Sequence, residues 1–118
     1  MKIRELIGES VGTFILVLVG CGSVAADVSY GTFGSLFNIA AMWGIGVTLA
    51  IYVANVFGSS HLNPAVSVAM CFSRDLPWKK LPTIVLSQFV GAILAGLSVY
   101  LIFGQGILDF EWAKDISR

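Results

Sequence analysis

The sequence predicts an all-α membrane protein with three transmembrane helices and one re-entrant half-helix. Apolar residues make up 57% of the 118 residues and charged residues only 12%, whereas soluble domains carry about a quarter charged residues. Three apolar stretches are each long enough to cross a bilayer, and a fourth, shorter one is interrupted. The length leaves room for one domain at most.

The three long apolar stretches cover about residues 6–26, 36–57 and 81–103. A bilayer core about 30 Å thick needs roughly 20 helical residues to cross it, and a helix satisfies its own backbone polar groups in lipid. Small residues recur at four-residue spacing in the first and third stretches, which lets helices approach closely. They are Gly8, Gly12, Ser87, Gly91 and Ala95.

The fourth apolar segment, at about residues 58–73, is predicted to enter the membrane and turn back. Asn63 is a good helix N-cap and Pro64 suits the first helical position, so a short helix begins there. Its length of about 15 Å is half the membrane, which is typical of a re-entrant or interfacial segment. The extended residues before Asn63 must therefore turn their carbonyl groups toward protein or a water-filled cavity.

The basic residues predict the orientation of the protein. If the fourth segment enters and leaves on one side, five of the seven basic residues lie on that side, and the positive-inside rule places the N-terminus in the cytoplasm. The five are Lys2, Arg4, Arg74, Lys79 and Lys80, and the other two, Lys114 and Arg118, lie in the tail. We therefore expect a multi-pass protein of the cell's inner (plasma) membrane.

Several other classes of protein fit the sequence poorly. A lipoprotein signal peptide ending at Cys21 is disfavoured, because the apolar run continues past it and Glu9 interrupts the run. The two cysteines have no metal or redox spacing, and the chain holds one histidine. No metal site, cofactor or enzyme activity is therefore expected, since paired carboxylates and nucleophile–base pairs are also missing. The chain has no basic patch for nucleic acid.

The segment around Asn63 also resembles a known family. The run His61-Leu62-Asn63-Pro64-Ala65-Val66 resembles the first Asn-Pro-Ala signature of the aquaporin (major intrinsic protein) family. The resemblance covers nearly the whole chain. The other matching positions are Glu9, the run from Ala41 to Gly46, the run from Ser87 to Ala92, and Asp109-Phe110-Glu111. It implies that residues 1–118 are the N-terminal repeat of a channel like the glycerol uptake facilitator, one half of an inverted repeat.

The resemblance implies a passive channel for glycerol or related small neutral polyols and water. Asn63 would donate its amide hydrogens to the permeant, and Trp43 would form one wall of the outer constriction, with Val47 one turn further on the same face. On the residues alone, Asn63 could be a plain helix cap and Trp43 an interfacial tryptophan. The expected pathway residues are Trp43, Val47, Ser59, Ser60, His61, Leu62, Asn63, Pro64 and Ala65.

Glu9 and Gln88 are expected to support the re-entrant segment. A charged residue inside a span is costly and needs a partner, and the best candidates for Glu9 are free backbone N–H groups near residues 58–61. The alternative is that Glu9 reaches the cytoplasmic surface. The resemblance also assigns Glu9 to bracing this loop, and Gln88 is expected to brace it as well.

The family resemblance further implies a partner for the chain. Channels of this family consist of two inverted repeats and assemble as homotetramers, so we expect a missing second repeat, and the 118 residues are interpreted as a fragment or truncated product. Expected contacts are glycerol or a small polyol, water and membrane lipid. Two alternatives stay open: a truncated, non-conducting membrane interaction module, and a water-selective aquaporin.

Overall fold

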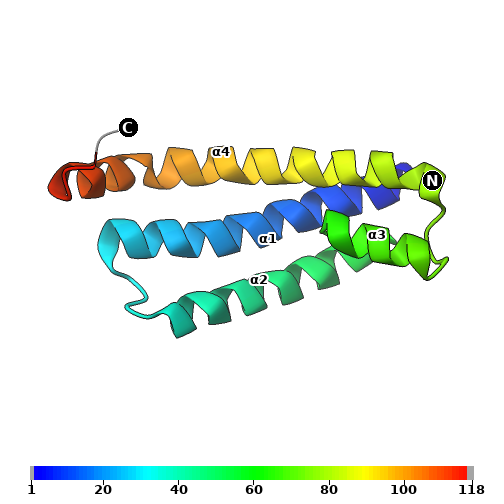
Figure 1. The fold of residues 1–118 in the computed structure, drawn as a ribbon, viewed down its shortest axis with the longest axis horizontal. Coiled ribbons are helices and arrows are strands. Elements are labelled where there is room, and N and C mark those ends of the chain that lie inside the picture. Colours follow the sequence, from blue (N-terminus) through cyan, green and yellow to red (C-terminus); the bar gives the residue numbers. More distant parts are fainter. Residues whose placement is uncertain (1, 117–118) are drawn as a thin grey trace.

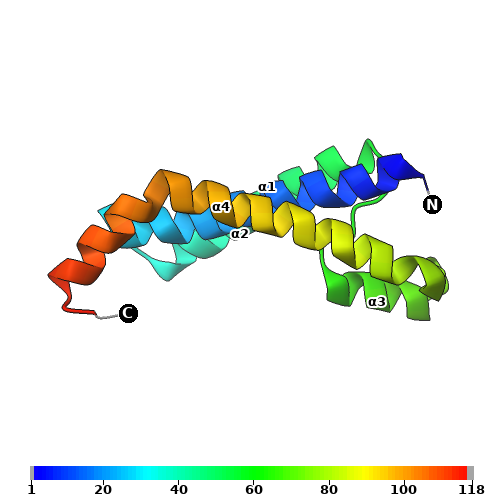
Figure 2. The ribbon, with the colours of Figure 1, turned by 90° about the horizontal axis from the view of Figure 1, so that it is seen from above.

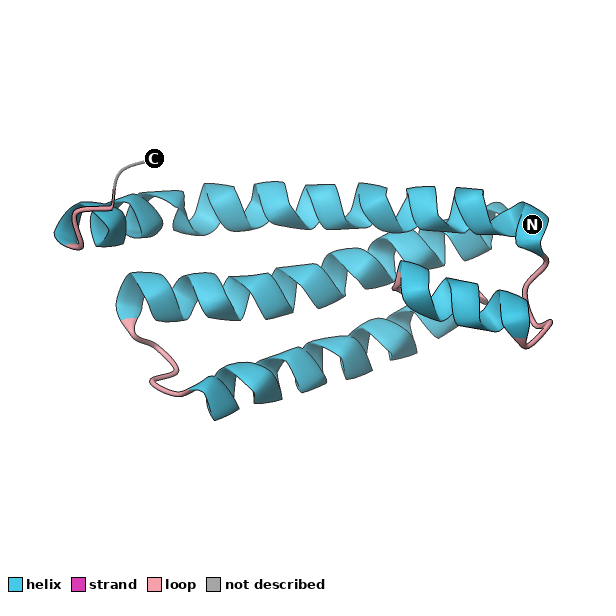
Figure 3. Ribbon diagram, viewed as in Figure 1, coloured by secondary structure: helices cyan, strands magenta, loops and turns pink. Residues whose placement is uncertain are grey.

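The computed structural model describes residues 2–116, and every regular element in that range is a helix (Figure 3). The order is α1 (Ile3–Tyr30), α2 (Leu36–Asn55), α3 (Pro64–Phe72), a 3-10 turn η1 (Trp78–Lys80) and α4 (Leu81–Ala113). Among the described residues, the helical segments Ile3–Tyr30, Leu36–Asn55 and Trp78–Ala113 are long and apolar enough to cross a membrane. The predicted fold class, three spanning helices and one short helix, is confirmed.

The three long helices lie along the 50 Å axis of the molecule, and α3 occupies only the end where α1 begins (Figure 1). α1 packs against both α2 and α4. The nine residues of α3 span about 14 Å, half the thickness of a hydrocarbon core. In Figure 2, α3 lies on the other side of α4 from the end of α2. The connection between α2 and α3 therefore passes across the bundle.

Small residues bring α1 close to both of its neighbours. A Cβ added at Gly91 of α4 would lie 2.1 Å from the carbonyl oxygen of Ser10 in α1, so the two backbones touch there. A Cβ at Gly12 would meet Leu62 and Ala54. Only small side chains allow such approaches between membrane helices. The four-residue spacing of small residues thus marks the contact faces of α1 and α4.

Two helices are longer than the expected spans, and one is slightly shorter. α1 extends beyond residues 6–26 at both ends, α2 stops at Asn55, and α4 continues past Phe103 to Ala113. The added turns of α1 and α4 support each other, because a Cβ at Gly106 would lie 2.7 Å from Cβ of Ser29, and the rings of Tyr30 and Phe103 are 6.5 Å apart. This packing against α1 thus keeps α4 helical through its glycine-rich stretch.

Five of the basic residues lie at one end of the bundle. Lys2 and Arg4 lie at the start of α1, and the other three lie between α3 and α4, at the same end (Figure 1). Those three are Arg74, Lys79 and Lys80. Lys114 follows α4 at the opposite end, and Arg118, the other basic residue of the tail, lies outside the described residues. Large apolar side chains of the long helices, such as Phe37 and Leu101, are exposed, as suits faces that contact lipid.

Candidate functional site

The start of α3 fixes the direction of the Asn63 side chain. Asn63 Oδ1 accepts a hydrogen bond from the backbone N–H of Ala65 at 2.8 Å, and Pro64 occupies the first turn, where no N–H is needed. Because the oxygen caps the helix, the Nδ2 group keeps both of its N–H donors. Asn63 is exposed, so these donors are accessible beside the positive end of the helix dipole.

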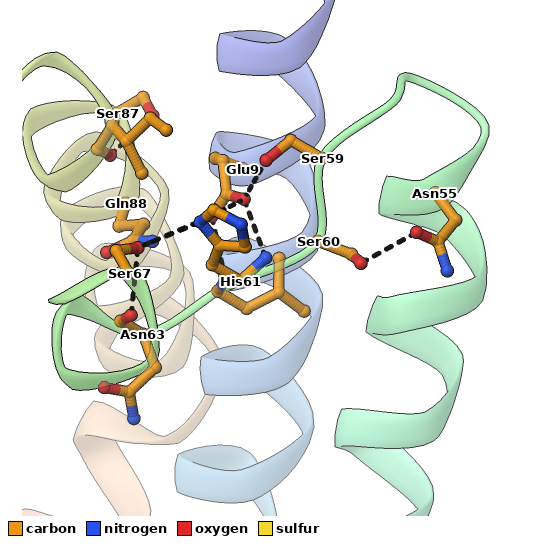
Figure 4. Close-up of polar contacts among 11 residues, drawn as sticks. Glu9, Asn55, Ser59, Ser60, His61, Asn63, Ser67, Ser87 and Gln88 are labelled. Carbon is orange, nitrogen blue, oxygen red and sulfur yellow. Dashed lines mark hydrogen bonds and ion pairs between the residues drawn. The ribbon is translucent and has the colours of Figure 1, made fainter. Parts of the chain in front are cut away.

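The Glu9 carboxylate lies fully buried behind the loop that leads into α3 (Figure 4). Its Oε1 accepts from Ser59 Oγ at 2.5 Å and from the backbone N–H of His61 at 2.7 Å. Its Oε2 accepts from the backbone N–H of Leu62 and from Gln88 Nε2, both at 2.8 Å. All four groups are donors, so a buried ionised carboxylate is well satisfied. Glu9 therefore faces the loop rather than the surface.

The hydrogen bonds to Glu9 determine where two loop carbonyls point. In a trans peptide the N–H and the preceding C=O lie on opposite sides of one plane, and no described peptide bond is cis. Since the N–H groups of His61 and Leu62 face Glu9, the carbonyls of Ser60 and His61 face away from it. Among residues 2–116 these carbonyls accept no hydrogen bond. The loop thus offers two free acceptors on the side opposite the acid.

Leu62 turns the chain from this loop into α3. Its φ of 56° lies in the left-handed region, which a residue with a branched side chain adopts only when its surroundings require it. The side chain is buried against Ala50 and Ala54, and Gly12 leaves room for it, since a Cβ there would lie 2.4 Å from Leu62 Cδ2. Packing of Leu62 therefore holds the turn.

Ser67 links the short helix to the same network. It is fully buried, and Gln88 Nε2 donates to its Oγ at 2.9 Å (Figure 4). Ser67 Oγ lies 3.2 Å from both the Asn63 carbonyl oxygen and His61 Nδ1. Gln88 thus contacts Glu9 and α3 together. The sequence reasoning gave Ser67 no role, although its place one turn after Asn63 was an available signal.

A cavity of about 290 Å³ opens beside the start of α3. From the expected pathway it brings together Trp43, Leu62, Asn63 and Pro64, and Gln88 also contributes to its wall. The remaining expected pathway residues are not on this wall; they are Val47, Ser59, Ser60, His61 and Ala65. The lining residues that sequence reasoning missed are Thr13, Leu16, Val17, Phe89 and Ala92. Thr13, Leu16 and Val17 follow Glu9 at helical spacing, a signal that could have placed them on one face with it.

Trp43 of α2 reaches the cavity because α1 has a glycine, Gly20, at the point where the two helices meet. A Cβ added at Gly20 would lie 2.5 Å from the indole ring, so the ring lies directly on the α1 backbone. Trp43 is 37% exposed, which leaves part of the ring open to the cavity. Val47, one turn further along α2, is half-buried. The cavity therefore has an aromatic wall, and the polar residues Asn63 and Gln88 also line it.

Comparison with known proteins gives one consistent set of matches. The family described as "Major intrinsic protein" matches residues 1–115. Human aquaporin-9 is 42% identical over 112 residues, which cover 94% of this chain and 38% of the relative. Aquaglyceroporin-9 of Botryotinia fuckeliana is 44% identical over 114 residues, which cover 96% of this chain and 25% of the relative. The X-ray structure of the aquaglyceroporin from Plasmodium falciparum has a TM-score of 0.84 and 32% identity, and the match covers 91% of this chain and 44% of that chain.

Proposed function

Because the chain belongs to the major intrinsic protein family, we propose that it forms the first repeat of a passive channel for glycerol or a related small neutral polyol and water. Its relatives include proteins named aquaglyceroporins, and the chain spans 38% of the length of aquaporin-9 and 44% of the chain of the structural neighbour. In this proposal the complete channel lies in the plasma membrane as a homotetramer, with the N-terminus in the cytoplasm.

One observation carries the proposal: Glu9 holds the loop before α3 so that its free carbonyls face away from the acid. A hydroxylated solute that leaves water can exchange its hydration for these acceptors and for the Asn63 N–H donors. The nearby cavity has apolar walls and a tryptophan face, which suits the carbon side of a polyol. The positive end of the α3 dipole repels cations. Together these groups favour neutral hydroxylated solutes.

The functional test distinguishes the role of Asn63 as an N–H donor from its role as the helix N-cap. Asn63→Asp keeps the cap, since aspartate is as good an N-cap as asparagine, but it removes both Nδ2 donors. The loss of one or two neutral hydrogen bonds should lower glycerol permeability about tenfold. Light scattering from vesicles would measure swelling in glycerol. The vesicles would carry this chain fused to the second repeat of an aquaglyceroporin, with and without the substitution.

Three outcomes of this test bear on the proposal. Glycerol entry through the unsubstituted fusion, and its loss in the Asn63→Asp fusion, would support it. A fusion that inserts and folds but conducts neither glycerol nor water would refute the channel proposal and favour the interaction module. A fusion that conducts water alone would replace the polyol assignment with a water-selective one.

A further inference from the structure

The α3–α4 turn (residues 72–80) presents two aromatic rings at the basic end of the bundle (Figure 1). The rings of Phe72 and Trp78 meet edge to face, with centroids 5.1 Å apart and planes at 88°. Phe72 is 74% exposed and Trp78 is 53% exposed. Trp78 lies in the 3-10 turn just before the apolar span of α4 begins at Leu81. An exposed tryptophan at the end of a span is typical of the headgroup level of a bilayer.

Burial and hydrogen bonds hold the α3–α4 turn in one position. Leu76, near its middle, is buried with Cys71 and Ile84. The backbone N–H groups of Leu76 and Asp75 both donate to the carbonyl oxygen of Met70 at 3.0 Å, which closes the C-terminal end of α3. The ring pair therefore sits on a turn that is anchored in the protein.

Three cations belong to the same turn, and they are Arg74, Lys79 and Lys80. None of them forms an ion pair with another residue in the range 2–116. The one acid of the turn, Asp75, accepts from Ser73 Oγ at 2.7 Å. Arg74 has a φ of 67°, at a place where helix ends favour glycine. The turn thus carries a net positive charge that the described chain does not neutralise.

The opposite end of the bundle has an exposed tryptophan but the contrary charge. Trp112, near the end of α4, is 84% exposed. Its neighbours in sequence are Asp109, Glu111 and Asp115, and the one described cation among them is Lys114. Exposed aromatic surface is therefore common to both ends. The charge distinguishes them.

We propose that the α3–α4 turn is a docking surface for anionic phospholipid in the leaflet that surrounds this end of the protein. The ring pair suits the boundary between headgroups and acyl chains, where amphipathic indole rings are favoured. The cations attract anionic headgroups over about one Debye length, 8–10 Å. Zwitterionic lipids offer the same chains without the net charge. The proposal rests on insertion of the chain in a bilayer and not on conduction.

The test compares two tryptophans of the same 118-residue chain in lipid nanodiscs. One variant keeps Trp78 alone (Trp43→Phe with Trp112→Phe), and the other keeps Trp112 alone (Trp43→Phe with Trp78→Phe). The nanodiscs contain phosphatidylcholine with a minor fraction of brominated phosphatidylglycerol or of brominated phosphatidylcholine. Bromine on the acyl chains quenches a nearby indole, so the two quenching efficiencies together give the local enrichment of anionic lipid.

We expect anionic lipid to be enriched around Trp78 and not around Trp112. One cation near an anionic surface corresponds to about a fivefold preference, so a net charge of two predicts an enrichment of about 5- to 25-fold. Lys79→Gln should lower it about three- to fivefold, whereas Lys79→Arg should keep it. Salt at about 1 M, where the Debye length is about 3 Å, should bring the enrichment close to one.

Equal quenching of Trp78 by the two brominated lipids, or an enrichment unchanged by Lys79→Gln, would refute the docking surface. Quenching by neither lipid would place the turn in water, open to a soluble partner, and would refute it as well. Native mass spectrometry of the chain with all its tryptophans gives a second measurement, should a tryptophan variant lose its helical circular dichroism. Lys79→Gln should retain less phosphatidylglycerol than Lys114→Gln, and equal retention would overturn the proposal. Glycerol flux in the vesicle assay is a separate result, which neither outcome decides.

Discussion

Replacing Glu9 with glutamine is the most direct perturbation of the loop that precedes α3. A glutamine can present one oxygen and one NH2 group at this position, whereas the native carboxylate presents two acceptors. Oε1 serves Ser59 and His61, and Oε2 serves Leu62 and Gln88. If the new NH2 group takes the place of Oε2, it meets the Leu62 N–H and the Gln88 NH2 group. If it takes the place of Oε1, it meets the His61 N–H, whereas the Ser59 hydroxyl can rotate to accept from it.

The size of the effect follows from these contacts. Hydrogen bonds to a charged group contribute about 1.5–3 kcal/mol each, so losing one or two predicts destabilisation of about 1.5–6 kcal/mol. Folded domains are stable by only about 5–15 kcal/mol, and Glu9 is fully buried, so water cannot replace the lost partners. Glu9→Gln should therefore remove a large part of the free energy of unfolding.

The assay is unfolding in mixed detergent micelles of increasing SDS content, followed by tryptophan fluorescence. Hydrogen exchange at the Leu62 amide adds a local readout. The matched control is Glu5→Gln, one turn earlier on α1. The half-buried Glu5 side chain accepts an exposed hydrogen bond from the Lys2 backbone N–H at 3.3 Å, which a glutamine oxygen can also accept. That change should alter stability by no more than about 0.5 kcal/mol.

The free energies of unfolding of Glu9→Gln and the Glu5→Gln control could differ by less than about 1 kcal/mol, with the Leu62 amide equally protected from exchange in both. That result would show that Glu9 does not hold the loop. The inferred direction of the Ser60 and His61 carbonyls would then lose its basis. Loss of Leu62 protection in Glu9→Gln alone is the result expected from the structure.

Two further predictions concern helix contacts and the cavity wall. Gly91→Ala should destabilise the bundle by about 1–3 kcal/mol through overpacking, because its Cβ would lie 2.1 Å from the Ser10 carbonyl oxygen. The control is Gly96→Ala, whose Cβ would meet no neighbouring segment within 4 Å and which should be neutral or slightly stabilising. Equal SDS midpoints for the two variants would contradict the α1–α4 contact. Trp43→Leu in the vesicle-borne fusion should change the ratio of glycerol to water permeability, since the ring lines the cavity, and an unchanged ratio in light-scattering traces would remove Trp43 from the selectivity argument.

The main elements of the fold could be predicted from the sequence, because lipid imposes simple rules. A span needs a fixed number of apolar residues, and Asn63-Pro64 is a local signal for a helix start. The continuation of α4 past Phe103 was not predictable in the same way. Gly104 and Gly106 favour a helix end, and the turns beyond them persist because Gly106 packs against Ser29 at the end of α1. Such a contact depends on two distant segments.

The partners of Glu9 were predictable in kind but not in detail. A buried charge in a span needs donors, and the loop before Asn63 is the nearest segment whose N–H groups are outside a helix. The sequence could not tell which N–H groups face the acid. Ser67 gave still less signal, because small hydroxyl residues occur throughout membrane helices. Its role follows only from its burial and from its hydrogen bond with Gln88.

The direction of the loop carbonyls comes from one acid and the planarity of the peptide bond. The backbone N–H groups of His61 and Leu62 bind Glu9, so the two preceding carbonyls must face the other side. Gln88 then connects the acid to Ser67 in α3, which ties the loop to the helix that carries Asn63. The acceptors on the loop and the donors on Asn63 are therefore positioned by the same buried carboxylate. A substitution at Glu9 should disturb both sets together, whereas a substitution at Asn63 should leave the loop acceptors in place.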